Sequence, residues 1–251
     1  MPRMLDIIIR ARPDKIAGIC LVRSPAKAGK PTGLMNTVRH RARYWRLRGF
    51  FTATVEYFAY RWADHLSKKL GTNWMTSARN VARRFGIPYF ESTAVNSEDF
   101  REMMRQVNAN LLVSISVPSL FKKETLETPE CGAINIHNGL LPDYRGLMPI
   151  LWALANGETE VGVTVHYMNE KFDEGSIVAQ ERAAVDPKDT VHTLEMKLRW
   201  DVGPRLLIRT MDDIKAGKAT TLPNPAGEGR YFGEPTPEAI DAFRRQGRRV
   251  R

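Results

Sequence analysis

The sequence predicts an α/β fold built on a mostly parallel, Rossmann-like sheet with helices on both faces. Short apolar runs that are typical of buried strands alternate along the chain with segments of helical periodicity. This alternation indicates successive strand and helix units, in which each helix packs back onto the sheet. At 251 residues the chain is long enough to bury a sizeable core, as one large domain or two small ones.

The first residues are predicted to form a helix followed by a strand. Leu5, Ile8 and Ile9 share one helical face, and Pro13 and Asp14 end this helix. A strand is then predicted over residues 16–22. The alternative is that residues 5–9 form a strand themselves, because the run Ile7 to Ile9 is β-branched.

Two basic segments follow. Residues 24–33 have the composition of a phosphate-binding loop, but Ser24 stands where the first glycine belongs and Pro31 interrupts the Gly-Lys-Ser/Thr core. We interpret them as a mobile, basic surface loop. Residues 36–70 are predicted to be largely helical, and over residues 39–58 arginines alternate with aromatic side chains. Such a pattern can bind nucleic acid or an anionic membrane surface, but aromatics at helical spacing are more often core residues.

Helices and strands continue to alternate through the middle of the chain. A helix is predicted over residues 77–85, where a glycine ends it, and a short strand follows over residues 87–90. A second helix begins at Ser97, a capping residue with two acidic residues in the next turn. A buried strand is predicted over residues 110–116, and a further helix is predicted to begin at Pro118.

The most informative stretch is the short apolar strand predicted at residues 133–137. Asn135 and His137 alternate with an isoleucine, so their side chains leave the same face of the strand. Buried polar groups are costly without partners, so an amide beside an imidazole on an apolar strand indicates chemistry. A second alternating strand, at residues 162–168, leads into a polar loop. This loop carries Asp173, a candidate partner for the imidazole of His137.

The remaining elements complete the α/β pattern. Residues 147–156 are predicted to form a helix, and residues 176–180 a strand. Either Asp189 or Thr190 is predicted to cap a long helix that follows. His166 lies in the middle of its strand, so we interpret it as a structural hydrogen-bonding residue and not as a catalytic one.

These motifs together resemble the formyltransferases that use 10-formyltetrahydrofolate, a family with glycinamide ribonucleotide, methionyl-tRNA and sugar-nucleotide enzymes. The resemblance is carried by Asn135-x-His137, Leu140-Leu141-Pro142, Tyr144-Arg145-Gly146, Gly162-Val163-Thr164-Val165-His166 and Asp173-x-Gly175. It is strong over residues 111–180 and looser from about residue 5 to residues 231–233. One departure is Asn138-Gly139, where many members have Pro-Ser, and it leaves the acceptor class open.

The resemblance implies a formyltransferase fold and a role for each matching residue. Asn135, His137 and Asp173 are implied to be the catalytic residues. The residues implied to bind folate are Ser116, Val117, Pro118, Tyr167, Met168 and Asn169. Tyr144 and Arg145 are implied to bind substrate, with an exposed ion pair as the alternative for Arg145. A plain strand-to-helix turn is the alternative for residues 116–118.

The resemblance also implies how the chain is divided. Residues 1–233 are predicted to form the catalytic domain, and residues 234–251 a final helix with an arginine-rich tail. Family members open with an apolar strand before their first helix, whereas this sequence enters what reads as that helix by Leu5. We therefore expect the central first strand to be missing, and a chain without it to be poorly stable and inactive. We likewise expect no C-terminal domain of the methionyl-tRNA type.

The predicted function is transfer of a formyl group from 10-formyltetrahydrofolate to the amine of a small metabolite, such as an amino-sugar nucleotide. The alternatives are a methionyl-tRNA formyltransferase and a formyltetrahydrofolate hydrolase or folate-binding relative. A net charge of +10 suits a phosphate-bearing small substrate as well as tRNA. In the predicted reaction Asn135 and a protonated His137 stabilise the developing oxyanion, and Asp173 favours the imidazolium.

The sequence carries few signals for other classes of protein. No spacing of cysteine and histidine resembles a metal site, and no Gly-x-Gly-x-x-Gly precedes a helix, so neither metal nor nicotinamide is implied. No apolar run approaches the ~18 residues of a membrane span, and a secretory signal is absent. Cys20 and Cys131 lie in apolar runs, which predicts buried thiols and a cytoplasmic protein.

Overall fold

The computed structural model describes residues 2–23, 62, 77–225 and 227–250. The described helices are α1 (Pro2–Ala11), α4 (Ala78–Phe85), α5 (Glu98–Gln106), α6 (Lys123–Leu126), α7 (Pro149–Ala155), α8 (Val191–Lys197), the π-helix η1 (Leu198–Val202), α9 (Gly203–Lys215) and α10 (Pro237–Arg245). The described strands are β1 (Ile19–Val22), β2 (Tyr89–Ser92), β3 (Leu112–Ile115), β4 (Ala133–His137), β5 (Arg145–Gly146), β6 (Glu160–Tyr167), β7 (Ile177–Ala184) and β8 (Tyr231–Phe232). The predicted α/β class is confirmed.

The basic loop predicted at residues 24–33 lies outside the described residues. The same holds for residues 36–70, apart from Trp62, so the predicted basic and aromatic helix is not described.

The strands form a two-stranded sheet β1-β2, a four-stranded sheet β3-β4-β6-β7 and a short sheet β5-β8. β4 pairs parallel with β3 on one side and antiparallel with β6 on the other. β7 continues the sheet antiparallel to β6. β4 is therefore an interior strand of the four-stranded sheet, with a neighbour on each edge. Within the described part of the chain, β1 and β3 each have only one paired edge.

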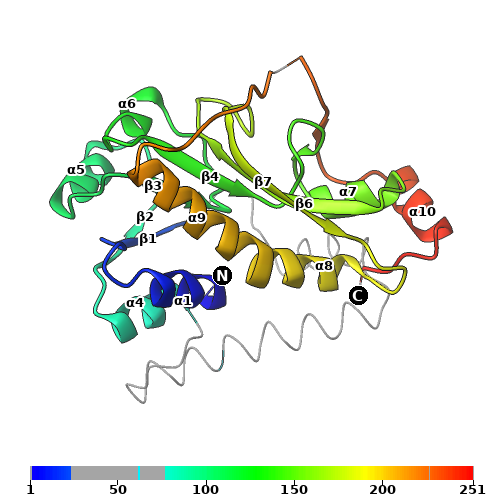
Figure 1. Ribbon diagram of the computed structural model, residues 1–251, viewed down its shortest axis with the longest axis horizontal. Helices are drawn as coiled ribbons and strands as arrows, with labels where there is room; N and C mark the ends of the chain where they lie inside the picture. Colours follow the sequence, from blue (N-terminus) through cyan, green and yellow to red (C-terminus); the bar gives the residue numbers. More distant parts are fainter. Residues whose placement is uncertain (1, 24–61, 63–76, 226, 251) are drawn as a thin grey trace, which may run out of the picture.

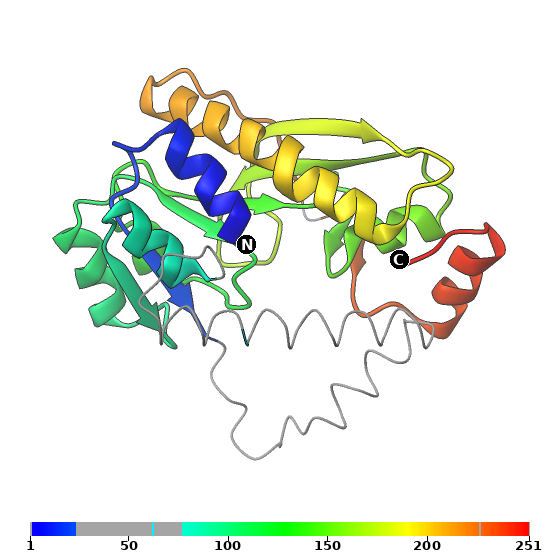
Figure 2. The ribbon, with the colours of Figure 1, turned by 90° about the horizontal axis from the view of Figure 1, so that it is seen from below.

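The N-terminal residues form helix α1, so the alternative of a strand at residues 5–9 is wrong. Met4, Ile8 and Ile9 are buried, and this spacing puts all three on one face of a helix but on both faces of a strand. The helix lies alongside α9 and also contacts α4, as both views show (Figures 1 and 2). The segment therefore forms a helix, as its apolar periodicity predicts, although three consecutive isoleucines favour a strand.

Helix α4 confirms the prediction for residues 77–85. Ser77 is the N-cap, and its hydroxyl accepts a hydrogen bond from the backbone N–H of Asn80. Gly86 ends the helix in the left-handed region, with a φ of 66°. Val81 of α4 packs against Ile19 of β1, which joins the helix to the two-stranded sheet.

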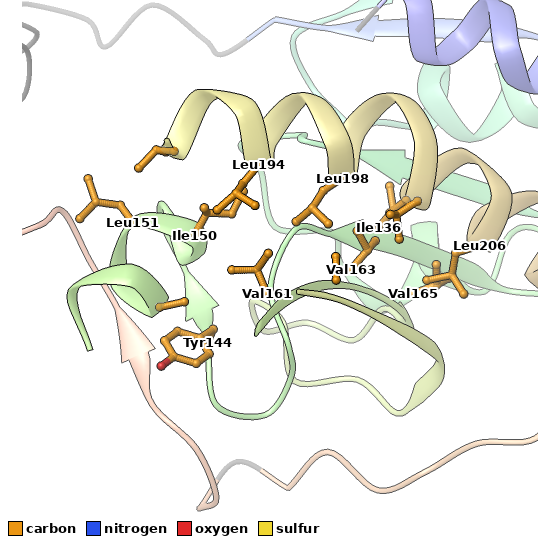
Figure 3. Close-up of a cluster of buried hydrophobic side chains, with 14 of the residues drawn as sticks. Ile136, Tyr144, Ile150, Leu151, Val161, Val163, Val165, Leu194, Leu198 and Leu206 are labelled. Atoms are coloured by element: carbon orange, nitrogen blue, oxygen red, sulfur yellow. The ribbon is translucent and has the colours of Figure 1, made fainter. Parts of the chain in front are cut away.

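The main core lies between the four-stranded sheet and the run α8-η1-α9, and Figure 3 shows part of it. Apolar side chains of β4 and β6 face those of the helices, and the labelled residues include Ile136, Val161, Val163, Val165, Leu194, Leu198 and Leu206. Thr190 caps α8 with a capping box, as one of the two predicted candidates. Gly203 follows the π-turn, and a Cβ on it would lie 3.3 Å from Ile136. The glycine therefore lets the helix approach β4 closely.

The helix predicted to begin at Pro118 does not form. Ser116 has a φ of 56°, which turns the chain out of β3, and the next helix, α6, begins only at Lys123. Asn96 holds the intervening segment, because its side chain accepts from the N–H of Lys122 and donates to the carbonyl of Leu120. These side-chain bonds replace the first turn of the predicted helix.

Candidate active site

A cavity of about 550 Å³ lies where β3 and β4 end. Its lining includes the three predicted catalytic residues and five of the six predicted folate-binding residues, which are Asn135, His137, Asp173, Ser116, Val117, Pro118, Met168 and Asn169. Three exposed apolar side chains, Leu120, Leu147 and Phe172, also line it. The structure thus brings together residues from positions 116 to 173, and the cavity combines apolar walls with a few polar groups.

Asn135 is held by a histidine that lies opposite it on the neighbouring strand. Asn135 of β4 is in register with His166 of β6. Nδ1 of His166 lies 2.7 Å from the carbonyl oxygen of Tyr167, so this nitrogen carries the proton and donates. Nε2 of His166 is then the acceptor for Nδ2 of Asn135, at 3.2 Å. One N–H of the amide is used by His166, and the other has no partner among the described residues.

His137 is buried and lies between a backbone carbonyl and a carboxylate. Its Nε2 lies 2.7 Å from the carbonyl oxygen of Tyr144 and donates to it. Its Nδ1 faces Oδ1 of Asp173 at 3.6 Å. The ring fits only beside a glycine, because a Cβ on Gly139 would lie 2.6 Å from Nε2.

Burial lowers the pKa of His137, although the carboxylate of Asp173 and the carbonyl of Tyr144 act in the opposite direction. The neutral imidazole is therefore the favoured form at pH 7. Asp173 favours the imidazolium, as expected, but desolvation of the ring outweighs this charge.

Asp173 is held in an unusual backbone conformation, with a φ of 56°. Its Oδ2 accepts a hydrogen bond of 2.9 Å from the N–H of Gly146, and its Oδ1 lies 3.7 Å from Nε2 of His166. Burial alone raises its pKa, but the groups around the carboxylate, among them the N–H of Gly146, outweigh burial, so the pKa of Asp173 is lowered. The carboxylate is therefore ionised at pH 7. His166, interpreted as structural from the sequence, contacts both Asn135 and Asp173.

Two of the predicted ligand-binding residues, Tyr144 and Tyr167, do not line this cavity. Tyr144 is buried directly before β5, where its ring stacks on Phe232 and its hydroxyl donates to Glu158. Burial raises the pKa of Tyr144 to about 12. The ring of Tyr167 lies beside Gly132 and not in the cavity. Both predictions are corrected, because neighbouring side chains pack these rings into the fold.

Arg145 does not reach the cavity either, which corrects its prediction as a ligand anchor. Its side chain is buried, and its N–H groups donate to the backbone carbonyls of Asp173, Asn224, Pro225 and Glu228 and to the side chain of Asn224. The guanidinium is thus occupied by the protein itself, and no donor faces a ligand. The sequence pattern located this residue but did not reveal its partners.

Two further properties concern the described residues as a whole. They contain no group of three or more histidine, cysteine, aspartate or glutamate side chains that could hold a metal ion. Among the same residues, no helix is long and apolar enough to cross a membrane. Cys20 and Cys131 are both free thiols, and burial raises the pKa of Cys20 to about 11.

Comparison with known proteins identifies relatives over much of the chain. Residues 65–211 match the family model described as Formyl transferase. A methionyl-tRNA formyltransferase from Kosmotoga olearia is 35% identical over 163 residues, which are 65% of this chain and 52% of that protein. The chain therefore spans about half the length of this curated relative.

Solved structures share the fold. Glycinamide ribonucleotide transformylase 1 from Symbiobacterium toebii aligns with a TM-score of 0.52 and 24% identity, over 58% of this chain and 71% of its own. A sugar 3N-formyltransferase, solved in the presence of dTDP and 5-N-formyl-THF, aligns with a TM-score of 0.51 and 19% identity, over 68% of this chain and 62% of its own. These likenesses confirm the predicted fold.

Proposed function

Because the chain belongs to the formyl transferase family, we propose that it transfers a formyl group from 10-formyltetrahydrofolate to the amine of a small metabolite. The observation that carries this proposal is the meeting of Asn135, His137 and Asp173 at one cavity. A phosphate-bearing acceptor, such as an amino-sugar nucleotide, agrees with the net charge of +10. The solved sugar formyltransferase supports this acceptor class.

The cavity fits a formyl donor with a flat heteroaromatic ring. Val117, Pro118 and Met168 provide apolar lining, while Ser116 and Asn169 add polar groups beside them. Pockets for such ligands are mostly apolar, with a few polar groups that fix orientation. Bound 10-formyltetrahydrofolate supplies the formyl group, and the relative solved with 5-N-formyl-THF supports this choice of donor.

Each catalytic residue has a role that follows from its contacts. The unpartnered N–H of Asn135 can donate to an oxygen that gains negative charge as the amine attacks, and one such donor is typically worth ~10² to 10³ in rate. Neutral His137 accepts the proton that the attacking amine loses, at Nδ1, because Nε2 already donates to Tyr144. Asp173 stabilises the imidazolium so formed. His137 then returns the proton to the departing folate nitrogen, so the amine loses one proton and the folate gains one.

An acceptor screen tests the proposal. Purified protein is mixed with 10-formyltetrahydrofolate and a panel of amines, including glycinamide ribonucleotide and amino-sugar nucleotides, and release of tetrahydrofolate is measured. Release that depends on one small acceptor is the expected result. Release without any acceptor would indicate a hydrolase, and no release in any mixture would contradict the proposed activity.

A second candidate is a methionyl-tRNA formyltransferase, and the identity of 35% to the Kosmotoga olearia protein favours it specifically. Salt dependence separates the two acceptor classes. A tRNA contacts many phosphates, so its binding weakens steeply with salt, whereas a nucleotide sugar carries few charges and responds weakly. Turnover of initiator tRNA with tight, salt-sensitive binding would replace the first proposal by this one. The cytoplasmic location stays a prediction under either function.

A further inference from the structure

Asp173 occupies a conformation that its neighbours must maintain. A residue with a side chain disfavours a φ of 56°, and such conformations persist only where surrounding contacts hold them. The side chain is bonded to Gly146, but this bond alone leaves the peptide group after Asp173 free to rotate. The hydrogen bonds to the carbonyl oxygen of Asp173 must therefore hold this backbone conformation.

The carbonyl oxygen of Asp173 accepts two hydrogen bonds from distant residues. Nε of Arg145 lies 3.0 Å from it, and Nδ2 of Asn224 lies 2.9 Å from it. The same Nδ2 also donates to the carbonyl of Gly175, at 2.9 Å. Nη2 of Arg145 in turn donates to Oδ1 of Asn224, so Arg145, Asn224 and Asp173 form a closed ring of hydrogen bonds.

The guanidinium of Arg145 is buried without a carboxylate partner among the described residues. Its relative exposure is 3%, and each of its nitrogens donates to a carbonyl or amide oxygen. A buried cation without a counter-ion is costly, which argues for a task beyond packing. Arg145 and the next residue bind Asp173 at both ends, since Arg145 holds its carbonyl while the N–H of Gly146 holds its carboxylate.

We propose that Arg145 and Asn224 are positioning residues that fix the backbone of Asp173 and thereby hold its carboxylate opposite His137. Neither residue touches the cavity, so both act through Asp173. The expected effect of these residues on catalysis rests on the proposed formyl transfer. The placement of the carboxylate itself can be measured without turnover.

The variant Asn224→Asp tests the proposal most sharply. The aspartate keeps an oxygen for Arg145 and gives the buried cation a counter-ion, which offsets part of the stability lost where its second oxygen faces the carbonyls of Asp173 and Gly175. The two N–H donors to Asp173 and Gly175 are lost, and a misplaced catalytic group can cost on the order of 10²-fold. We therefore expect kcat to fall about 10- to 100-fold while KM for the folate changes less than about twofold.

The second variant is Arg145→Lys, which keeps the charge but loses the planar fork. It should also lower kcat. Arg101→Lys is the matched control, because Arg101 likewise donates to a backbone carbonyl and a carboxylate but lies on α5, away from the cavity. The control should retain wild-type kcat and KM.

A titration of His137 by NMR gives a readout that folding stability does not move. In Asn224→Ala the same donors are lost without added charge, and the released carboxylate should no longer raise the pKa of His137, which should fall below the wild-type value. Wild-type kcat in Asn224→Asp, or a wild-type titration in Asn224→Ala, would overturn the positioning role. If the titration shifts as expected but the wild-type protein formylates no acceptor, positioning stands and the proposed function fails.

Discussion

The two-stranded and four-stranded sheets of this protein differ in how far they are enclosed. In β4 and β6 most residues are buried, whereas β1 has one buried residue, Ile19, and β2 has none. Described residues of β3 and β4 line the cavity, and none of β1 or β2 does. Two of the polar site residues, Asn135 and His137, therefore lie on an interior strand, where β3 and β6 fix its position. The two-stranded sheet supports the fold without contributing lining residues.

The largest loss of activity should follow from substitutions within the four-stranded sheet and its loops. Asn135→Ala, His137→Ala and Asp173→Ala should each lower kcat by roughly 10² or more, because each removes a contact made mainly in the transition state. Affinity for the folate should change little. Steady-state kinetics with the cognate acceptor provide the measurement, and near-full activity of His137→Ala would show that the site is assigned wrongly.

An isoleucine-to-alanine substitution in each sheet should lower the free energy of unfolding by different amounts. Ile134→Ala removes a side chain that is 0% exposed and should cost about 2 to 5 kcal/mol of unfolding free energy. Ile19→Ala in the two-stranded sheet, where the side chain is 8% exposed, should cost less and leave kcat unchanged. Urea unfolding measures both. An equal loss in the two variants would remove the distinction between the sheets.

Acid should weaken the two sheets in different pH ranges. Burial lowers the pKa of His137 in the folded protein. As the pH falls, the unfolded chain therefore binds a proton at this histidine before the folded protein does. The folded state loses stability from the ordinary histidine range downward. At the two-stranded sheet a hydrogen bond from Arg79, with further bonds from Tyr89 and Arg23, lowers the pKa of Glu91. Stability from Glu91 is present above the ordinary carboxylate range and is lost only as pH falls through it.

Hydrogen exchange followed by mass spectrometry at several pH values checks this order. As the pH falls, the amide protection of β4 and β6 should decline before that of the two-stranded sheet, where Glu91 lies. In His137→Asn, the decline in β4 and β6 at the higher pH should be absent. The activity should decline over the same range as His137, because the protonated ring cannot accept a proton. Rising activity on acidification from pH 7 would contradict the proposed base.

The smallest loss of stability should follow from removing the N-cap of α4. Ser77→Ala removes the hydroxyl that accepts from Asn80 and should cost about 1 kcal/mol of stability. Thermal unfolding measures this loss, and kcat should stay at the wild-type value, since no residue of α4 lines the cavity. A clear fall in kcat would show that the two sheets are coupled.

Local patterns predicted much of the fold and the central residues of the site. The period of two placed Asn135 and His137 on one face, and the polar loop after the next strand supplied Asp173. Caps at Ser97 and Thr190 were also recognisable, because a capping hydroxyl acts on residues within one turn. These features depend on neighbours in sequence, which is why a pattern can reveal them.

The remaining contacts join residues that are far apart in sequence. Arg145 and Asn224 are 79 positions apart, and side chain to backbone bonds of this kind leave no periodic signal. The parallel pairing of β5 with β8 involves only Arg145 and Gly146 with Tyr231 and Phe232, too short to predict. The Pro118 helix was predicted wrongly for the same reason, since Asn96 reaches that segment from outside it.

The late position of these partners has a consequence for synthesis on the ribosome. Asp173 is held through Asn224, and β5 is held by β8, so contacts that shape the site come from residues made well after the last catalytic one. We expect a nascent chain that has emerged only through β7 to carry its catalytic residues without their final geometry. The site should therefore reach its final geometry only after Asn224 and β8 have left the exit tunnel.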